Sequence, residues 1–576
     1  MTEARAILKT HWGYPDFREP QEEIIERVLA NEDILALLPT GGGKSICFQI
    51  PALVRPGICI VVSPLIALME DQVNTLKEKN IKAMAITGGI SFPELDKMLD
   101  NCIYGKYKFL YLSPERLQQD IVMERIRQMD VNLVAIDESH CISQWGHDFR
   151  PSYLHISMLR ELKPEVNFIA LTASATKPVV GDIISQLDLR EPVIIKKSFE
   201  RKNISYSVEH ADDKLARLEK LLLENKESAI VYVGSRRATV EISEYLKSRQ
   251  ISAAAFHGGI TRKEKSLRLK EWLSGKNRIM VATGAFGMGI DKPNVRTVIH
   301  MQLPDSLENY FQEAGRAGRD GKFSQAVILM NSADIPMLKD RFIKNLPEID
   351  FVRLIYRRLM SYFRIAYGEG EGIVENINFS DFCNTYGLHI LKTYNTLQLL
   401  DRAGILQLTE HYRKKTFIRF IITPAQLRAF IDKNLQFQPV VNTILRSYGG
   451  TLEAKTEIDL KAISTKAGSN LHETVKVLSR LNNEEIAEFE HDMHDLSIGF
   501  LLPREDELTI NPIIPYIRSR SESKKNKIAA VIDYIKNNDQ CKSEQLLKYF
   551  GESRTTPCGI CSVCQNSTAQ NKNRKN

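Results

Sequence analysis

The chain has 576 residues, more than one hydrophobic core normally serves, so several domains of roughly 100–200 residues are expected. With 43% hydrophobic and 26% charged residues it has the composition of an ordinary soluble globular protein, and no stretch approaches the ~18 consecutive apolar residues that a membrane span needs. The 78 Lys and Arg residues against 71 Asp and Glu residues give a net charge of +7, which permits a polyanionic partner without requiring one.

The two ends of the chain indicate its compartment. The segment from Met1 to Arg18 lacks the basic region, apolar core and cleavage site of a secretory signal, so we expect a cytoplasmic protein, associated with the nucleoid if it is bacterial. Four of the nine cysteines crowd the end of the chain, and the others are scattered singly at Cys47, Cys59, Cys102, Cys141 and Cys383. In a cytoplasmic chain this distribution favours a metal over disulfides.

From about residue 30 to residue 330, short β-branched runs alternate with helix-length segments. In the first half the runs are Ile58 to Val62, Phe109 to Leu112, Leu133 to Ile136 and Phe168 to Leu171. In the second half they are Ala229 to Val233, Ala253 to Phe256, Arg278 to Ala282 and Val298 to Met301. A polar stretch from Lys202 to Lys214 separates the halves. The pattern predicts two α/β lobes, each a parallel sheet with crossover helices, joined near residue 205.

A glycine-rich loop follows the apolar run Ile34 to Leu38, where a strand should turn into a helix. Its sequence is P-T-G-G-G-K-S, and it predicts a cradle for the phosphates of ATP built from Thr40, Gly41, Gly42, Gly43, Lys44 and Ser45. Lys44 supplies a charge at the β and γ phosphates, and Ser45 offers a hydroxyl to Mg²⁺. Leu38 stands where the usual pattern has its first glycine, and a plain glycine-rich turn is the alternative interpretation.

Two carboxylates emerge at the end of the predicted buried strand Leu133 to Ile136. The next residues are D-E-S-H, and ligands bind at the carboxyl ends of such strands. Asp137 can hold the Mg²⁺ that bridges the phosphates, and Glu138 can orient the attacking water, as phosphoryl transfer requires. Acids that merely cap a helix are the alternative interpretation.

The segment Q-E-A-G-R-A-G-R-D-G, from Gln312 to Gly321, carries two arginines three residues apart. We predict that they share one helical face and reach across a cleft, where a guanidinium stabilises the charge that develops on the γ-phosphate. Arg319 is the first choice for this role and Arg316 the second. Two solvated arginines on a helix are the alternative interpretation.

Beyond about residue 340 the pattern changes to helices with short strand pairs, and an internal repeat appears at an offset of 81 residues. Gly387, Leu397, Leu400, Ile405 and Phe417 match Gly468, Leu478, Leu481, Ile486 and Ile498. In each copy a short helix, a turn at the glycine and a longer helix precede two strands around a polar loop, which predicts two winged-helix segments. A basic stretch from Arg518 to Lys527 follows, and the polar end of the chain from Gln565 is predicted to be disordered.

Together these residues look like those of a superfamily 2 helicase, and their details resemble the RecQ family over residues 8 to 330. The resemblance implies two RecA-like lobes that hydrolyse ATP with Mg²⁺ and unwind DNA in the 3′-to-5′ direction. It implies single-stranded DNA and forked or tailed duplexes as partners, and a role in DNA repair or recombination.

The segment H-W-G-Y-P-D-F-R-E-P-Q, which ends at Gln21, is similar to the family's adenine-reading segment. The resemblance implies that the Gln21 amide hydrogen-bonds the base edge and that Arg18 supports it. V-S-P-L-I-A-L-M-E-D-Q and Y-L-S-P-E-R lie along the nucleic-acid path in the family, which implies phosphate contacts for Ser63, Pro64 and Ser113.

Two further segments resemble parts of the motor that couple ATP to DNA. T-A-S-A-T, Thr172 to Thr176, is similar to the segment that links hydrolysis to strand movement. A-T-G-A-F-G-M-G-I-D-K-P, Ala282 to Pro293, is similar to the combined ATP and DNA segment of the second lobe. It implies Thr283 on DNA and Gly289 and Asp291 beside the nucleotide.

The segment S-H-C-I-S-Q-W-G-H-D-F-R-P-S-Y, directly after the two acids, looks like the RecQ aromatic-rich loop. Trp145 and Phe149 would stack on bases while Arg150 meets phosphate, so that strand occupancy is reported to Glu138. A buried aromatic cluster is the alternative for Trp145, and its replacement by alanine would then cost stability instead of DNA-stimulated ATP hydrolysis.

Near the end of the chain, C-K-S-E-Q-L-L-K-Y-F-G-E followed by C-G-I-C-S-V-C resembles the family's zinc module. The four thiolates, at spacings of 16, 2 and 2 intervening residues, fit tetrahedral Zn²⁺ in a closed, structural site. They are Cys541, Cys558, Cys561 and Cys564.

The chain departs from the family pattern because its winged-helix-like segments precede the zinc module. The first proposed wing, H-Y-R-K-K, suits a tip that contacts a DNA fork through Tyr412 and Arg413. The second, Glu488 to Asp495, is acidic and would repel phosphate, so we expect it to pack or to meet protein. Exposed polar loops are the alternative interpretation for both.

The sequence thus predicts an α/β protein with two tandem RecA-like parallel-sheet lobes, mainly helical winged-helix-like segments and a C-terminal zinc-binding module. The expected boundaries are 1–205 and 206–340 for the lobes, 341–430 and 431–515 for the winged-helix-like segments, 516–566 for the zinc module and 567–576 for a disordered tail. An ATP-dependent 3′-to-5′ DNA helicase is the leading hypothesis. A DNA-dependent ATPase that translocates without unwinding, an RNA helicase, and a scaffold with an inactive motor are the alternatives.

Overall fold

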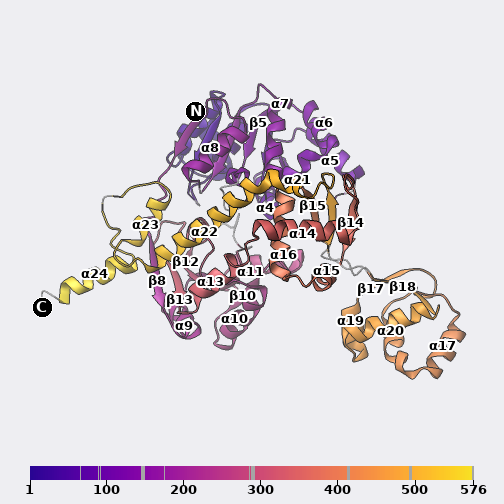
Figure 1. Cartoon of the computed structure of the whole chain (residues 1–576). Helices are drawn as coiled ribbons and strands as arrows, with labels where there is room; N and C mark the ends of the chain where they lie inside the picture. The colour runs from indigo at the N-terminus through magenta and orange to yellow at the C-terminus, as the bar shows by residue number, and fades with distance from the viewer. Residues whose placement is uncertain are drawn as a thin grey trace. The chain divides into compact units, whose positions relative to one another are not determined.

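The computed structural model describes residues 1–39, 41–64, 66–87, 90, 92–143, 149–173, 175–284, 286, 292–410, 416–491, 496–554 and 556–573 (Figure 1). The chain divides into two compact units, Met1–Lys344 with Ser519–Asn576, and Asn345–Arg518. None of the helices in these ranges has both the length and the apolar character that crossing a membrane requires.

The first lobe of the larger unit is built on a seven-stranded sheet of order β3-β4-β2-β5-β6-β1-β7, in which every pairing is parallel. Its strands are β1 (Ile34–Leu37), β2 (Ile58–Val62), β3 (Ala83–Ile86), β4 (Phe109–Leu112), β5 (Val131–Ile136), β6 (Phe168–Thr172) and β7 (Val193–Lys196). Its α-helices are α1 (Thr2–Trp12), α2 (Gln21–Leu29), α3 (Ile46–Val54), α4 (Ile66–Glu78), α5 (Phe92–Tyr104), α6 (Asp120–Gln128), α7 (Met158–Leu162) and α8 (Lys177–Gln186). Three 3₁₀ helices complete it: η1 (Pro114–Gln118), η2 (Ser139–Ile142) and η3 (Pro151–Ser157).

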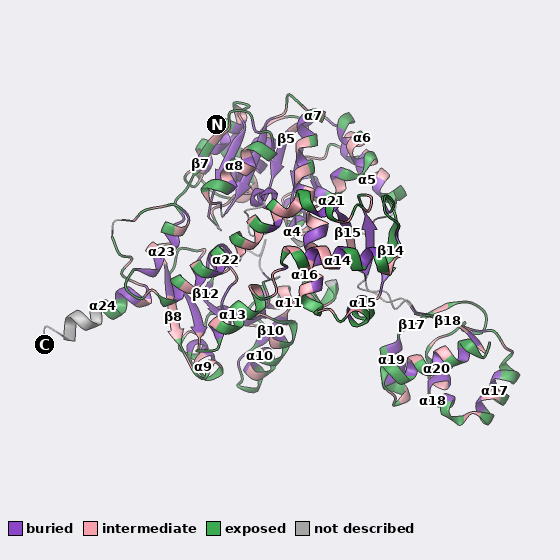
Figure 2. Ribbon diagram, in the orientation of Figure 1, coloured by how far each residue is buried: buried purple, intermediate pink, exposed green. Residues whose placement is uncertain are grey.

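The inner strands of this sheet are almost entirely buried (Figure 2). Leu35 and Leu37 of β1 belong to the apolar core on one face, and Ile34 and Ala36 belong to the core on the other. Because successive residues of a strand point to opposite faces, a strand covered by helices on both sides must be apolar throughout. This is why the strands appear in the sequence as uninterrupted apolar runs.

The second lobe is a six-stranded, all-parallel sheet of order β10-β11-β9-β12-β13-β8. Its strands are β8 (Ile204–His210), β9 (Ser228–Tyr232), β10 (Ala253–Phe256), β11 (Ile279–Ala282), β12 (Val295–His300) and β13 (Ser324–Met330). Its helices are α9 (Lys214–Glu224), α10 (Arg236–Ser248), α11 (Arg262–Leu273), α12 (Leu307–Ala314) and α13 (Asp334–Phe342). The prediction of a polar connection from Lys202 to Lys214 is wrong, because β8 lies inside it as an edge strand whose polar residues alternate with buried Ile204 and Tyr206.

The C-terminal segment packs against the second lobe. It consists of the last part of α22 (Ile514–Lys536), α23 (Lys542–Tyr549) and α24 (Ser562–Asn573). Ile528 and Val531 of α22 and Leu547 and Phe550 around α23 lie in the same apolar core as residues of the second sheet. The prediction of disorder from residue 567 is wrong as far as Asn573, because helix α24 begins at Ser562 and continues to Asn573.

The smaller unit contains two apolar cores. The first is formed by α14 (Ile349–Tyr362), β14 (Val374–Ile377), α15 (Phe379–Tyr386), α16 (Ile390–Arg402), β15 (Leu406–Glu410), β19 (Leu496–Phe500), α21 (Glu507–Ile510) and η5 (Asn511–Ile513). The second is formed by β16 (Thr416–Phe420), α17 (Pro424–Lys433), η4 (Leu435–Phe437), α18 (Gln438–Ser447), β17 (Thr456–Ile458), α19 (Leu460–Ala467), α20 (Leu471–Asn483) and β18 (Ala487–His491).

The structure confirms that the helices of the predicted internal repeat recur, but the predicted pairing of its strands is wrong. Gly387 and Gly468 both end their short helices in the left-handed conformation, and α16 and α20 both span 13 residues. The two strands of each copy do not form a hairpin, however. Instead β15 pairs antiparallel with β19, and β16 pairs antiparallel with β18. The second domain is therefore nested within the first, and a boundary at residue 430 would fall inside α17.

Candidate functional site

The phosphate loop connects β1 to α3 at the edge of the first sheet where the strands end. Gly41 and Gly43 adopt φ values of +81° and +73°, which residues with a side chain rarely adopt. The Lys44 ammonium lies 3.3 Å from Glu138 Oε1, with both side chains largely buried. Ser45 stands directly before the first residue of α3, so its hydroxyl is available at the start of that helix.

The Gln21 side chain closes the back of this loop. Its amide nitrogen donates to the carbonyls of Gly42 and Gly43 at 3.3 and 3.1 Å, and its amide oxygen accepts from the backbone N–H of Arg18 at 2.8 Å. A Cβ added at Gly43 would lie 2.2 Å from the Gln21 nitrogen. The structure thus brings the predicted base-reading residue to the phosphate loop, where its amide is engaged by protein backbone.

Asp137 and Glu138 lie at the end of β5, as predicted from the strand pattern. Asp137 is 6% exposed, and burial together with the neighbouring Glu138 charge raises its pKa to about 6 against the lowering effect of Lys44. Glu138 has φ +48° and donates its backbone N–H to Asp137 Oδ1 at 2.9 Å. A buried carboxylate whose ionised form is disfavoured by a like charge is well suited to a cation, so these residues fit Mg²⁺.

His140 connects Glu138 to Thr172, the last residue of β6. The sequence pattern had not indicated this role. Its Nδ1 lies 2.8 Å from Thr172 Oγ1 and 3.3 Å from Glu138 Oε2, and the ring is 1% exposed. Thr172 begins the T-A-S-A-T segment. The only signal in the sequence was the histidine of D-E-S-H, which no local pattern links to a residue 32 positions away.

The two arginines of the second lobe occupy different environments. Helix α12 ends at Ala314, so Arg316 and Arg319 lie in the turns that follow and not on one helical face as predicted. Gly318, with φ +57°, lies between them in these turns. A Cβ added at Gly41 would lie 3.3 Å from Arg319 Cγ, which places Arg319 against the phosphate loop. Arg316 is 5% exposed and hydrogen-bonds Tyr232 within its own lobe.

The predicted nucleic-acid residues of the first lobe are only partly accessible. Ser63 is 1% exposed and Phe149 is 6% exposed, so neither side chain is presented to solvent in this structure. Arg150 donates to the Pro64 carbonyl at 2.8 Å, which joins the aromatic-rich segment to the predicted path. Ser113 is partly exposed and precedes η1.

Thr283 is partly exposed at the end of β11 and donates its backbone N–H to the Phe256 carbonyl at 3.3 Å. Six other predicted site residues lie outside the described residues: Thr40, Trp145, Gly289, Asp291, Tyr412 and Arg413.

The four C-terminal cysteines form one cluster. Their sulfur atoms all lie within 4.8 Å of one another, with separations such as 3.4 Å for Cys561 to Cys564 and 3.8 Å for Cys561 to Cys541. Tetrahedral Zn²⁺ with bonds of about 2.3 Å places its sulfur ligands roughly 3.8 Å apart. Backbone N–H groups of Lys542 and Cys558 point at two of the sulfurs, as thiolate ligands require. The cluster therefore fits a structural zinc ion.

Comparison with protein families covers most of these elements. The DEAD/DEAH box helicase family matches residues 18–183, and the helicase conserved C-terminal domain matches residues 213–321. The RecQ helicase winged-helix domain of Bacteroidota matches residues 418–491, which is the nested domain, and the RecQ zinc-binding family matches residues 506–565.

Curated relatives of this chain are also RecQ helicases. The chain is 40% identical over 334 residues to the ATP-dependent DNA helicase RecQ of Synechocystis sp., covering 56% of this chain and 70% of that protein. The chain belongs to the RecQ helicase family. The RecQ of Bacillus subtilis (strain 168) is 44% identical over 335 residues, which cover 58% of this chain. The matched region spans only 57% of that RecQ, and little more than half of the RecQ proteins of Pasteurella multocida and Haemophilus influenzae.

Among solved structures, the DUF1998 helicase MrfA bound to DNA and AMPPNP is similar to this chain with a TM-score of 0.50 and 21% identity. The match covers 59% of this chain and 52% of that one. At this identity the likeness concerns the fold alone. RecQ membership therefore rests on the family matches and the curated relatives.

Proposed function

We propose that this RecQ-family chain is an ATP-dependent DNA helicase that moves 3′ to 5′ along single-stranded DNA and unwinds forked or tailed duplexes. The observation that carries the proposal is the convergence of Lys44, Glu138 and Arg319 on one phosphate loop. The names of the relatives, ATP-dependent DNA helicase RecQ, support ATP and DNA as substrates. The direction of movement, the forked or tailed duplexes and a cytoplasmic, nucleoid-associated role in repair or recombination are what the resemblance to the RecQ family implies.

The protein side of the reaction follows from the positions of these groups. Lys44 holds the β and γ phosphates, and Glu138 orients the attacking water and withdraws its proton. Arg319 approaches from the second lobe and stabilises the charge that develops on the transferred phosphoryl group. Mg²⁺, when bound at Asp137 and Ser45, supplies Lewis-acid stabilisation of the phosphate oxygens.

Coupling to DNA runs through the contacts that surround Glu138. His140 joins Glu138 to Thr172 at the start of the T-A-S-A-T segment, and Arg150 joins the aromatic-rich segment to Pro64. We assign Ser63, Pro64, Ser113, Thr283 and the aromatic-rich segment to the DNA path. The side chains of Ser63 and Phe149 are buried in this structure. Their contact with DNA therefore requires rearrangement of the residues that cover them.

ATP turnover and strand separation on forked, tailed and blunt DNA, beside matched RNA, test the proposal. We expect DNA-stimulated turnover that falls by about 10³-fold or more in Arg319→Ala. Arg237→Ala is the matched control, because Arg237 is an exposed arginine of the same lobe that pairs with Glu241 four residues away. Turnover without strand separation would instead identify a translocase, and the absence of turnover with Mg²⁺ and single-stranded DNA would refute the motor.

A further inference from the structure

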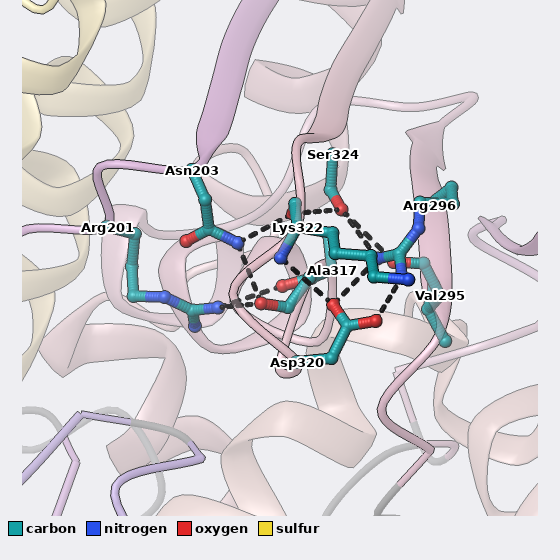
Figure 3. Close-up of polar contacts among 9 residues, drawn as sticks. Arg201, Asn203, Val295, Arg296, Ala317, Asp320, Lys322 and Ser324 are labelled. Atoms are coloured by element: carbon teal, nitrogen blue, oxygen red, sulfur yellow. Dashed lines mark hydrogen bonds and ion pairs between the residues drawn. The ribbon is translucent and has the colours of Figure 1, made fainter.

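The loop that carries Arg316 and Arg319 is held from behind by the segment that connects the two lobes. Arg201 donates through Nη1 to the Gly315 carbonyl at 2.8 Å and through Nη2 to the carbonyls of Ala317 and Gly318 at 2.9 and 3.2 Å. Figure 3 shows this side chain and its neighbour Asn203 reaching into the loop from the connecting segment. One guanidinium therefore binds three backbone carbonyls within residues 315–318.

Asn203 completes this grip. Its amide nitrogen donates to the Gly318 carbonyl at 2.7 Å and to the Lys322 carbonyl at 2.9 Å. Gly318 has φ +57°, and a Cβ added there would lie 2.4 Å from the same Asn203 nitrogen. The loop can pass this point only as glycine, and Asn203 occupies the space that a side chain would take.

The environment of Arg201 shows that these contacts are not incidental. Burial lowers the pKa of its guanidinium, so the charged group has lost water, and the loop carbonyls replace part of that hydration. On the far side of the loop, Arg296 binds Asp320 and donates to Ser324 at 3.1 Å (Figure 3). The loop that carries Arg316 and Arg319, called the arginine loop below, is thus held from two sides by side chains of the second lobe and of the connecting segment.

The connecting segment is itself held by the zinc module. Glu552 accepts hydrogen bonds from Ser198 Oγ at 2.7 Å and from the Phe199 backbone N–H at 3.2 Å. Glu200 forms an ion pair with Arg554. The Phe199 ring lies 5.0 Å from that of Phe550. Residues 198–203 therefore run between two fixed bodies, the zinc module on one side and the arginine loop on the other.

We propose that Arg201 and Asn203 are positioning residues for ATP hydrolysis, which hold the arginine loop so that Arg319 meets the γ-phosphate. The inference rests on the proposed function, since it concerns the same reaction. Both residues act through backbone carbonyls of the loop. A displacement of about 1 Å in such a catalytic group costs up to roughly a hundredfold in rate.

Steady-state ATP turnover with saturating single-stranded DNA tests this proposal. Arg201→Ala and Asn203→Ala should each lower kcat by about tenfold or more while KM for ATP changes by less than about threefold, because the lost interaction belongs to the transition state. Arg201→Ala combined with Arg319→Ala should be no slower than Arg319→Ala alone, because the loop then has nothing left to position. Arg201→Lys, which keeps the charge but loses the planar fork, should recover only part of the rate.

Arg278→Ala is the matched control for loss of stability. Arg278 is also a partly buried arginine of the second lobe, and it donates to the carbonyls of Leu222 and Asn225 at 3.0 and 2.7 Å, away from the arginine loop. It should lower the unfolding temperature to a similar degree with kcat unchanged. If Arg201→Ala does not fold, Asn203→Ala and Arg201→Lys decide the question.

The positioning role is refuted if the Arg201 and Asn203 variants have the kcat of the wild type. It is also refuted if the losses of kcat in Arg201→Ala and Arg319→Ala multiply in the double variant. Inactivity of the wild-type chain would refute the proposed function instead.

Discussion

Replacing Asp137 by asparagine should stabilise the magnesium-free protein, although it removes a residue assigned to the reaction. Asp137 is buried at the end of β5, and its pKa is raised to about 6, mainly by burial and then by the charge of Glu138. Folding at neutral pH therefore forces an ionised carboxylate into a site that disfavours it. Asparagine keeps the shape without the charge.

The size and sign of the effect follow from the pKa. A rise from 3.8 to about 6 corresponds to about 3 kcal/mol at full ionisation, since one pKa unit is about 1.4 kcal/mol. Because the folded pKa is above the unfolded one, the destabilising contribution of Asp137 is absent below pH 3.8 and reaches its full size as the pH rises through about 6. The advantage of Asp137→Asn should therefore grow by about 1.4 kcal/mol between pH 5 and pH 8.

Urea unfolding at several pH values measures this difference, in magnesium-free buffer without chelator so that zinc stays bound. Asp33→Asn is the control, because Asp33 is equally buried in the first lobe but pairs with Arg160 and accepts the backbone N–H groups of Phe168 and Arg190 at 2.7 Å each. It should destabilise the protein. The reasoning fails if Asp137→Asn is no more stable than the wild type at pH 8, or if the difference does not change with pH.

Four further predictions concern the nucleotide, the zinc module and the fork. Gly43→Ala should weaken ATP binding at least about tenfold in a fluorescent-nucleotide titration, because the new Cβ meets Gln21 at 2.2 Å and φ is +73°; unchanged affinity would mean that the loop is adaptable. Phe550→Ala should cost about 3–5 kcal/mol of stability by emptying part of the second lobe's core, and an unaltered melting curve would contradict that packing. Removing zinc with a chelator under reducing conditions should lower the melting temperature of the larger unit, measured by calorimetry, whereas no shift would show that the cysteines do not need a metal. Tyr412→Ala with Arg413→Ala should slow unwinding and flatten the salt dependence of DNA binding, and a fork role is excluded if both stay as in the wild type.

The parallel sheets were predictable because their strands are buried on both faces. Phe109–Leu112 is apolar throughout and appears in the sequence as β4 with the same bounds. The edge strand β8 was missed because its sequence alternates apolar with polar residues and only its first three residues are buried, so it resembles a polar connection. The strand exchange in the smaller unit was also missed, since Leu406–Glu410 is equally able to pair with the strand nearest in sequence or with one 86 residues further on.

The nucleotide site also contains some residues that could be predicted from the sequence and others that could not. Lys44, Asp137 and Glu138 were predictable because each follows a strand, and parallel strands end at one edge of the sheet. His140 and Arg201 were not, because their partners lie 32 and 114 or more residues away and no local pattern records those contacts. Distant pairing of this kind depends on the folded geometry, which sequence spacing does not contain.

The nested domain is connected to the rest of the smaller unit through β15 and β19, two strands that pair with each other. Glu410 of β15 and Leu496 of β19 are register partners, and so are Thr416 of β16 and His491 of β18. A two-residue turn could therefore join Glu410 to Leu496 and leave the host sheet intact. We therefore expect that the residues between Glu410 and Leu496 can be removed or exchanged while the host sheet and the two helicase lobes keep their structure.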